Sequence, residues 1–567
     1  MDKIFLDGQW SFCIDDQSET GEPITYSHAI NVPYAAESKL SGVGFTGNIR
    51  SCRYKKAISG FAVPEGERLF LRFGACDYVA TVFINGHAVC VHEGGYTPFE
   101  ADITDFWLTK GENVIEVAVS DDMREYKASG KQTKKDKPYG CFYTRATGIW
   151  QSVYIECRKS ERITDVKFFP DINAPAVEVA LKSNAKGEVS IEFFYENRLC
   201  GKTEGVLDFD GRFICRLSEK HLWEIGNGRL YDVVITFAGA KTALQCGLRE
   251  VKFDGVKFLL NGKSVFQRLV LDQGYYPGGD YTPASATDFE EDIRRAQTLG
   301  FNGARLHQKV FDPAYLDAAD RLGFLVWDEF PSWGVDFGNL EYFDCFRSQW
   351  KEVLDRDFNH PSVVIWCPFN EVWNNSTKLN VTPDLRFIEN IYEFTKAYDP
   401  SRPCVDVSGG YHGRKTDLFD FHSYGSADDI SDILCRLEKK GELVADLIYG
   451  APPYRFKKGM PVMLSEFGGI AMIENSNVPT VNEDAVLAEE PWGYGKGETS
   501  PDKFAERIIS LVDVILDSPS VSGFCYTQLY DIMQEQNGLF TYERKCKFSE
   551  KEVERIKRHI SRRAAIE

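Results

Sequence analysis

The sequence predicts three domains in series: two β-sandwiches and then a barrel of alternating strands and helices. The chain has 567 residues, a length that suits about three domains of ordinary size. Short strands fill the region up to about residue 252, and helices of convincing length begin only after it. This change of pattern places the expected domains at residues 1–158, 159–252 and 253–567.

The two sandwiches are predicted from short apolar strands that are separated by turn residues. In the first domain, Asn85 and Gly86 follow a candidate strand at residues 78–84 and favour a hairpin turn, with residues 87–92 as the returning strand. Because no long helix interrupts the strands, we expect sheets packed as sandwiches. The other candidate strands of both domains cover residues 69–74, 114–119, 177–181, 189–194, 213–217 and 233–237.

The third domain opens with a strand, a helix and a second strand. Residues 265–272 form an apolar strand, and Thr287 with Glu290 has the spacing of a capping box that begins a helix. Apolar residues at helical spacing continue this helix until Gly300. The second strand covers residues 303–307.

The next helix is marked at both ends. Asp312 and Pro313 suit the N-cap and the first helical position, and Gly323 ends the helix before a strand at residues 324–328. Eight strands that alternate with amphipathic helices predict a parallel (β/α)8 barrel, although an open doubly wound sheet fits the early units nearly as well. The remaining candidate strands cover residues 363–367, 405–408, 418–422, 462–466 and 523–528.

The chain is acidic, with a formal net charge of −19. This acidic composition excludes a broad basic surface that would bind nucleic acid or an anionic membrane. The basic run at residues 131–137 is expected to be a solvated loop. No apolar run is long enough for a signal peptide or a transmembrane helix. We therefore expect no nucleic-acid or membrane partner, and the sequence leaves a homo-oligomer open.

Cysteines and histidines indicate neither disulfides nor a metal site. The 15 cysteines are scattered singly, and several, such as Cys367 and Cys525, lie inside apolar strands. Buried reduced thiols in a cytoplasmic protein explain this distribution better than disulfides. The 9 histidines form no zinc motif, and no glycine-rich phosphate loop follows a strand. Neither a metal nor a cofactor is expected.

Polar residues cluster at the carboxyl ends of the predicted barrel strands, where a barrel carries its active site. Carboxylates cleave a glycosidic bond by protonating the leaving oxygen and by stabilising or trapping the anomeric carbon. Aromatic rings stack on sugars, and amides bind sugar hydroxyls, so the set favours carbohydrate chemistry. In chain order the residues are Asp272, Gln273, His307, Asp328, Glu329, Asn370, Glu371, His422, Tyr424, Glu466 and Tyr526.

Glu371 and Glu466 end the fourth and seventh strands, which face each other across the barrel. Their carboxylates are expected to approach to about 5–5.5 Å, the separation that retaining glycosidases use. A single glutamate at a strand end is more often structural than catalytic, so the pairing carries the prediction. Trp366 lies in mid-strand and is expected in the core, and Trp373 or Trp366 is a candidate for the apolar surroundings of Glu371.

Four segments resemble glycoside hydrolase family 2, which includes β-galactosidases, β-glucuronidases and β-mannosidases. They are residues 94–102 (GGYTPFEAD), 147–150 (TGIW), 356–371 (RDFNHPSVVIWCPFNE) and 462–469 (VMLSEFGG). The resemblance covers nearly the whole chain. It implies a jelly-roll sandwich, an immunoglobulin-like sandwich and a catalytic TIM barrel, in that order.

The resemblance also implies roles for individual residues. Glu371 becomes the general acid/base and Glu466 the nucleophile of a retaining mechanism, and Asn370 contacts the sugar 2-hydroxyl. Tyr424 is placed to hydrogen-bond the nucleophile, and Tyr526 stands where the family usually has tryptophan. The further candidates for substrate binding are Asp272, His307, Asp328, His422, Tyr424, Trp373 and Tyr526.

Departures from the family motifs bear on the substrate. The N-x-K motif with which family glucuronidases grip the uronate is absent from residues 526–543, and residues 271–278 replace a histidine-rich turn. An exo-β-glycosidase acting on galactosides is the first expectation, with glucuronides, galacturonides and α-L-arabinopyranosides as alternatives. A uronide would need a basic residue such as Arg145, Lys309 or Arg305. The hypothesis from a different class is a non-catalytic carbohydrate-binding protein.

Overall fold

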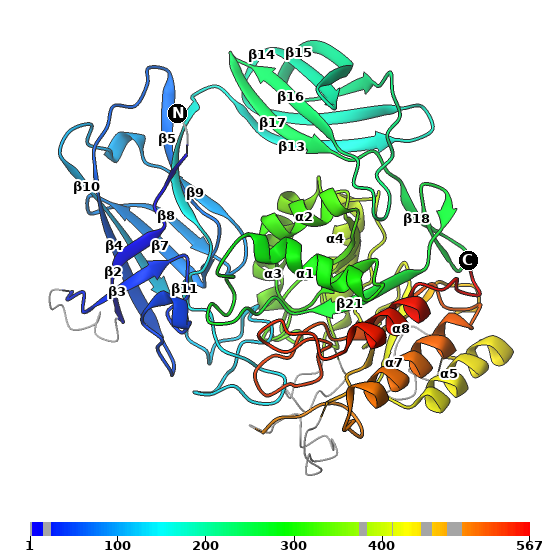
Figure 1. The fold of residues 1–567 in the computed structure, drawn as a ribbon. Helices are drawn as coiled ribbons and strands as arrows, with labels where there is room; N and C mark the ends of the chain where they lie inside the picture. The colour runs from blue at the N-terminus through cyan, green and yellow to red at the C-terminus, as the bar shows by residue number, and fades with distance from the viewer. Residues whose placement is uncertain (1–2, 15–23, 373–382, 411, 444–455, 473–489) are drawn as a thin grey trace.

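A computed structural model describes residues 3–14, 24–372, 383–410, 412–443, 456–472 and 490–567. The first domain, drawn in blue in Figure 1, contains two antiparallel sheets. The larger has the order β3 (His28–Val32), β2 (Gly8–Ile14), β4 (Ser51–Ser59), β10 (Glu112–Ser120), β7 (Val79–Ile84) and β8 (His87–Glu93). The smaller has the order β1 (Ile4–Phe5), β12 (Val153–Lys159), β5 (Glu67–Phe73) and β9 (Phe99–Asp102), and β6 (Cys76–Asp77) pairs with β11 (Gly148–Ile149).

Alternating side chains explain why this first domain is a sandwich. Along β10 every second residue is buried, so one face of the strand packs on the core and the other meets solvent. The predicted hairpin is present, because Asn85 and Gly86 join β7 to β8 with positive φ angles of 51° and 84°.

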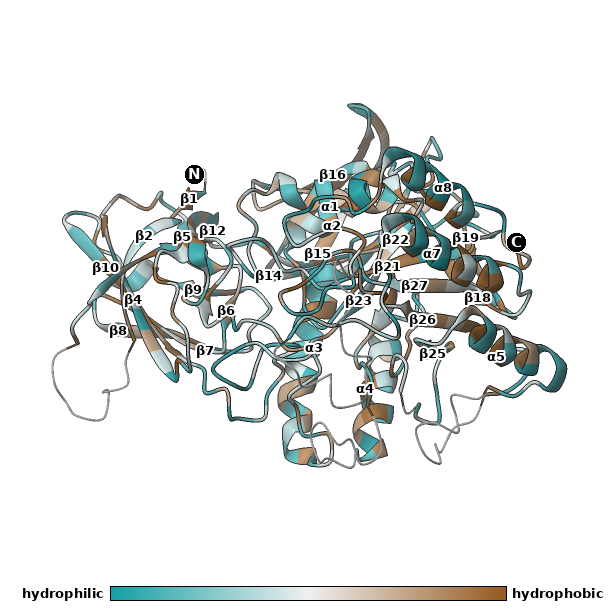
Figure 2. Ribbon diagram, turned by 60° about the horizontal axis from the view of Figure 1, so that its bottom comes forward, coloured by the Kyte–Doolittle hydropathy of each residue, from teal (hydrophilic) through white to brown (hydrophobic). Residues whose placement is uncertain are grey.

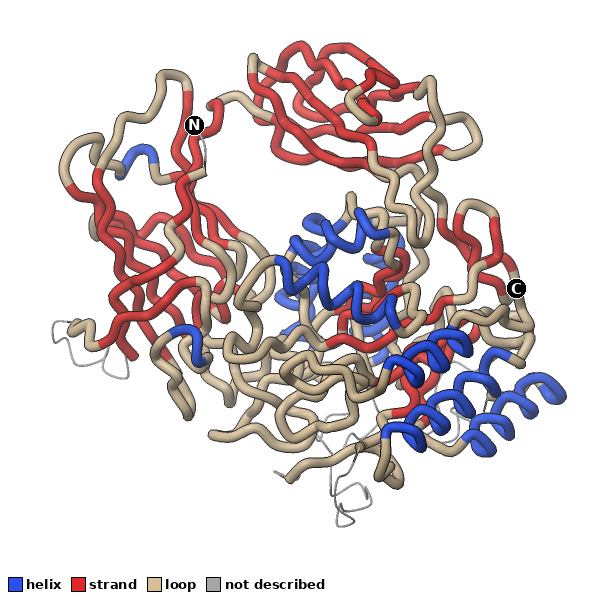
Figure 3. The backbone as a smooth tube through the Cα atoms, viewed as in Figure 1, coloured by secondary structure: helices blue, strands red, loops and turns tan. Residues whose placement is uncertain are grey.

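The second domain is also built from strands, as the red segments at the top of Figure 3 show. The strand β14 pairs with β13 along its first part, with β16 along its second part, and with β15 along most of its length. A small three-stranded sheet then leads into the barrel. The strands are β13 (Ile163–Asp171), β14 (Ala176–Tyr195), β15 (Arg198–Arg216), β16 (Tyr231–Phe237), β17 (Ala240–Cys246), β18 (Val251–Asp254), β19 (Lys257–Leu260) and β20 (Lys263–Ser264).

The third domain is a curled parallel sheet with helices around it. Seven strands pair in the order β24 (Val363–Cys367), β23 (Leu325–Glu329), β22 (Gly303–Leu306), β21 (Gln267–Asp272), β27 (Gly523–Thr527), β26 (Val462–Gly468) and β25 (Phe419–Ser423). The expected fifth strand is present as parallel bridges that join Cys404 to Trp366 and Ser408 to Asn370. The predicted order of two sandwiches and a barrel is therefore confirmed.

Seven α-helices are described around the barrel, and Figure 2 shows both hydrophobic and hydrophilic residues on α5, α7 and α8. The α2 boundaries agree with the prediction, since Asp312 caps the helix and Gly323 ends it with φ 64°. The predicted capping box of α1 is wrong, because the N-cap is Ala286 and no side chain caps the helix there. The helices are α1 (Thr287–Thr298), α2 (Pro313–Leu322), α3 (Phe343–Asp357), α4 (Leu385–Tyr398), α5 (Ala427–Lys440), α7 (Pro501–Leu516) and α8 (Glu550–Ile560).

Two separate cores give each barrel strand an inner and an outer face. Leu269, Trp327 and Cys525 fill the barrel interior, whereas Val270 and Trp366 belong to the layer between strands and helices. Trp366 also donates a hydrogen bond to Asp399, as suits the core position predicted for it. None of the described helices has the length and apolar character needed to cross a membrane.

Candidate functional site

Glu371, which follows β24, and Glu466, which lies on β26, meet at the carboxyl end of the barrel. One carboxylate oxygen of each glutamate and a ring nitrogen of His422 all lie within 4.8 Å of one another. His422 places Nδ1 2.9 Å from Glu371 Oε1 and Nε2 3.5 Å from Glu466 Oε1. The two carboxylates are therefore close enough to act on the two sides of one glycosidic bond, where retaining enzymes need about 5–5.5 Å.

The backbone of Glu371 adopts an unusual conformation at this point. Its φ angle is 44°, in the left-handed region that residues other than glycine rarely occupy. A hydrogen bond of 2.8 Å from the Glu371 N–H to the Ser408 carbonyl holds it there. Strained backbone of this kind is found preferentially at functional sites.

Arg305 organises the base of the site from strand β22. Its buried guanidinium donates to Glu466 Oε1 (2.9 Å), to Glu329 Oε2 (2.7 Å) and to Asn370 Oδ1 (2.6 Å). Burial raises the pKa of Glu466, but the charges of His422 and Arg305 outweigh burial and hold the pKa well below its usual range. Glu466 is therefore an ionised carboxylate at neutral pH, as a nucleophile must be.

Tyr424 contacts the second oxygen of the same carboxylate. Its hydroxyl donates to Glu466 Oε2, and its ring stacks on Tyr494 with centroids 3.5 Å apart and planes 3° from parallel. Burial and the charge of Glu466 raise the pKa of Tyr424 well above its usual value, so the hydroxyl remains a donor.

His307 and Asn370 complete the inner set. His307 Nδ1 lies 3.0 Å from Glu329 Oε1, and burial lowers the pKa of His307, which leaves the ring neutral at neutral pH. The backbone carbonyl oxygen of Asn370 accepts a hydrogen bond of 3.0 Å from Trp333 Nε1. The structure thus brings six of the predicted site residues together: His307, Asn370, Glu371, His422, Tyr424 and Glu466.

Three other predicted residues lie on the outer face of the barrel. Burial and the nearby Asp292 of α1 raise the pKa of Asp272 to about 6, and burial and Asp357 of α3 raise the pKa of Asp328 well above its usual range. Tyr526 belongs to the core between strands and helices. The structure does not bring these three to the glutamates, and Trp373 lies outside the described residues.

Residues beside them on the inner face stand at strand ends in the sequence but were not predicted to bind substrate. On β23 it is Glu329, and not the predicted Asp328, that lies on the inner face and binds Arg305, and the Thr527 hydroxyl lies 3.4 Å from that of Tyr424. Gln273 donates to the Tyr143 hydroxyl (3.1 Å), which comes from the first domain. The alternation of strand side chains was the signal that could have identified them.

The basic run at residues 131–137 is not uniformly solvated, contrary to the expectation. Lys131 is only 8% exposed, and Gln132 and Thr133 are 4% exposed each. Gln132 donates to buried Asp77 (2.6 Å) and accepts from the Ala146 N–H (2.9 Å). These two contacts stay within the first domain, whereas Lys131 Nζ lies 5.5 Å from the centre of the Trp333 ring and so brings the loop to the barrel.

Within the described parts of the chain, two clusters have distances that a metal ion could use. One is Glu371, His422 and Glu466, and the other is Asp317, Asp320 and His360. In the first cluster Arg305 already donates to Glu466, so a cation would meet an existing positive charge. In the second, His360 lies 2.6 Å from Asp320 Oδ2, and Asp320 Oδ1 accepts from the Ser362 N–H.

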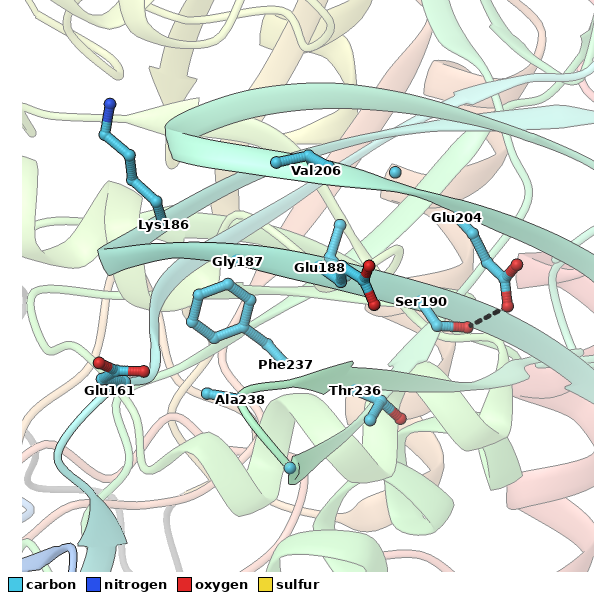
Figure 4. A pocket seen from close by; sticks show the side chains of 13 residues that line it. Glu161, Lys186, Gly187, Glu188, Ser190, Glu204, Val206, Thr236, Phe237 and Ala238 are labelled. Atoms are coloured by element: carbon cyan, nitrogen blue, oxygen red, sulfur yellow. Dashed lines mark hydrogen bonds between the residues drawn. The ribbon is translucent and has the colours of Figure 1, made fainter.

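A separate hollow of about 770 Å³ lies on the second sandwich. Figure 4 shows side chains of β14, β15 and β16 around it, with Ser190 donating to Glu204. None of the described residues that line it comes from the barrel, so it is distinct from the paired glutamates.

The fold and the paired carboxylates define a barrel protein with two auxiliary sandwiches, and comparison with known families agrees. Residues 51–157 match the sugar binding domain of glycosyl hydrolases family 2. Residues 254–481 match the TIM barrel domain of the same family. Together the two matches cover more than half of the chain, and the protein belongs to glycosyl hydrolase family 2.

The similar proteins are named for two activities, β-galactosidase and β-glucuronidase. The chain is 25% identical over 423 residues to a β-galactosidase of Thermoanaerobacterium thermosulfurigenes, a match that covers 71% of this chain and 56% of that protein. It is 26% identical over 443 residues to a β-glucuronidase of Streptococcus agalactiae, with 71% of each chain covered. The chain therefore spans little more than half the length of the first relative.

Solved structures share the fold at lower identity. A β-glucuronidase of Lactobacillus rhamnosus matches with a TM-score of 0.77 at 20% identity, over 99% of this chain and 98% of that one. The agreement extends over both sandwiches and the barrel.

Proposed function

We propose that the protein is a retaining exo-β-glycosidase, with Glu466 as nucleophile and Glu371 as general acid/base. The observation that carries the proposal is the approach of both carboxylates to within 4.8 Å of His422 and of each other. Ionised Glu466 attacks the anomeric carbon while Glu371 protonates the leaving oxygen. Glu371 then takes a proton from water, which attacks the glycosyl-enzyme and releases the sugar with its configuration retained.

The surrounding residues support this division of roles. Arg305 and Tyr424 donate to different oxygens of Glu466, so they hold the nucleophile in one orientation and keep it ionised. His422 contacts both glutamates, so it can exchange a proton with them as Glu371 loses and regains its own. Asn370 is held by Arg305 beside Glu371, where it can bind the sugar 2-hydroxyl.

The two activities among the relatives support a β-galactoside or a β-glucuronide as the substrate. Exo action is supported by the first domain, whose Tyr143 donates to Glu535 of the loop after β27 and so places part of this domain against the barrel mouth. The cysteines are mostly buried and none is bridged to another described cysteine, which supports a reducing, cytoplasmic setting.

A panel of 4-nitrophenyl glycosides tests the activity. It contains the β-D-galactoside, β-D-glucuronide, β-D-galacturonide, β-D-mannoside and α-L-arabinopyranoside. We expect hydrolysis of at least one, and a loss of about 10⁴-fold or more in Glu466→Gln. No hydrolysis of any member would leave the non-catalytic carbohydrate-binding protein as the better hypothesis.

The stereochemistry tests the separate roles. In Glu371→Ala, azide takes the place of the water that Glu371 would activate, and the expected product is the β-glycosyl azide. An α-azide, identified by its proton NMR coupling constant, would contradict the assignment of Glu466 as nucleophile.

A further inference from the structure

The first domain sends a loop to the barrel mouth. The backbone N–H groups of Ser129 and Gly130 both donate to the Trp333 carbonyl oxygen, at 3.0 Å each. Gly130 has a φ angle of 56°, and a Cβ atom there would lie 2.1 Å from the Gln308 carbonyl oxygen. The loop is therefore fixed tightly against the segments that follow strands β22 and β23, and the next residue, Lys131, is presented to the site.

Lys131 lies between the two sides of the site. Its Nζ atom is 5.5 Å from the centre of the Trp333 ring, and Trp333 Nε1 donates to the carbonyl oxygen of Asn370. On the other side, the Tyr143 N–H donates to the Lys131 carbonyl oxygen (2.8 Å), and the Tyr143 hydroxyl donates to Glu535. The lysine thus stands close to the catalytic glutamates without being one of their ligands.

The ammonium group is charged at neutral pH despite its burial. Burial lowers the pKa of Lys131, but the negative charges of Glu535, Glu466 and Glu371 raise it by more, so the pKa ends above its usual value.

The other basic residues that could bind a uronate carboxylate already donate hydrogen bonds within the protein. Arg305 donates to Glu329 and Glu466, Arg145 donates to Asp121, and Lys309 donates to two backbone oxygens. By contrast, no oxygen of the described residues accepts a hydrogen bond or forms an ion pair with Lys131 Nζ. A cation that is 8% exposed and has only the Trp333 ring beside it, with no oxygen partner in the described part of the chain, is costly, so an anionic group of a ligand would be bound strongly there.

We propose that Lys131, supplied by the first domain, receives the carboxylate of an acidic sugar bound beside Glu371 and Glu466. The inference rests on the proposed function and names its substrate class: a β-linked hexuronide. The lysine would then do from the first domain what the N-x-K motif, absent from residues 526–543, does in family glucuronidases. Three ammonium donors suit a carboxylate that approaches from the interior of the site.

The ratio of kcat/KM for acidic and neutral substrates tests this role. The acidic substrates are the 4-nitrophenyl β-D-glucuronide and β-D-galacturonide, and the neutral ones are the corresponding β-D-glucoside and β-D-galactoside. We expect the wild type to favour an acidic substrate, and Lys131→Met to lower the ratio about 100-fold, as loss of a charged hydrogen bond requires. Lys131→Arg should retain part of the preference. Lys137→Met, at an exposed position of the same loop, should leave the ratio unchanged.

Each result that differs from the expected one leads to a different conclusion. A wild type that hydrolyses the neutral galactoside faster than either uronide overturns the inference and leaves the proposed function standing. Equal losses on acidic and neutral substrates in Lys131→Met also overturn it, because they indicate a structural role only. No turnover of any glycoside removes the proposed function itself.

A binding measurement covers the case in which Lys131→Met does not fold. Calorimetric titration of the Glu466→Gln protein should show that D-glucuronate or D-galacturonate binds at least about tenfold more tightly than D-galactose. Equal affinities for the acidic and neutral sugars would overturn the inference.

Discussion

His422 stands between the two carboxylates, and its protonation is linked to both of them. Burial lowers the pKa of His422, but Glu466 and Glu371 more than compensate and the pKa lies above its usual value. A histidine whose pKa is higher in the folded state stabilises the fold below its unfolded pKa of about 6.5. That contribution disappears as the pH rises through the higher folded pKa.

His422→Gln should therefore cost more stability in acid than in base. We expect the difference in the free energy of unfolding between wild type and variant to be larger at pH 5.5 than at pH 9, because only the charged ring attracts the glutamates. Urea denaturation at the two pH values measures it, with His87→Gln on the exposed edge of β8 as the control. Equal losses at both pH values would show that the ring acts by packing alone.

At the scale of single residues, the sequence predicted which residue types form the site better than it predicted the direction in which each side chain points. Glu371, Glu466 and His422 were found because their positions after strands and their chemistry agree. Asp328 was chosen over its neighbour Glu329, and the structure turns Asp328 toward α3 while Glu329 binds Arg305. Neighbouring residues of a strand point to opposite faces, so an error of one residue selects the wrong face. A short buried strand such as β23 has apolar residues on both faces, so its hydrophobic pattern does not distinguish them.

At the scale of elements, the segment that follows residues 404–408 determines where His422 can lie. Gly409 has a φ angle of 65°, and a Cβ atom there would lie 2.0 Å from His422 Nε2. The ring occupies the space that any side chain at residue 409 would fill. Glycine is therefore required for two reasons: the left-handed backbone and the close approach of the imidazole.

Gly409→Ala should displace His422 and lower kcat/KM about 100-fold, since shifts near 1 Å at a catalytic centre have effects of this size. Gly459→Ala is a matched control, because Gly459 has a φ angle of 98° and no described atom within 4 Å of the point that a Cβ would occupy. Both variants carry backbone strain, but only the first meets the imidazole. If both lower kcat/KM equally on the preferred aryl glycoside, strain rather than the contact is responsible.

The elements themselves were largely predictable, and their contacts were not. Strand alternation, helical spacing and cap residues such as Asp312 and Gly323 are local signals, so most strands and the boundaries of α2 follow from them. The loop that carries Lys131 has no such signal. Its burial arises from contact with Trp333, some 200 residues later in the chain, and charge composition alone suggests a solvated segment.

At the scale of the whole molecule, part of the family-like segment 356–371 serves to join domains. Asn359 uses its amide to accept from the Phe168 N–H (3.0 Å) and to donate to the Val166 carbonyl (2.7 Å) of β13. The Pro361 carbonyl accepts from Arg249 (3.0 Å), which precedes β18. These contacts tie the second sandwich to the barrel, on which the glutamates depend for their positions.

Asn359→Ala should therefore lower stability without changing the chemistry. It leaves a backbone donor and acceptor unpaired at the domain junction, which costs about 1–3 kcal/mol, whereas kcat/KM on the preferred aryl glycoside should stay within about twofold of wild type. Asn184→Ala is a matched control: Asn184 accepts from Arg162 N–H (2.8 Å) and donates to Ser160 carbonyl (2.7 Å), but at an exposed position of the second sandwich. Because water can replace the bonds of Asn184, the free energy of unfolding should fall less in that variant. A loss of kcat/KM in Asn359→Ala at unchanged stability would instead mean that this residue acts on the site rather than on the docking of the domains.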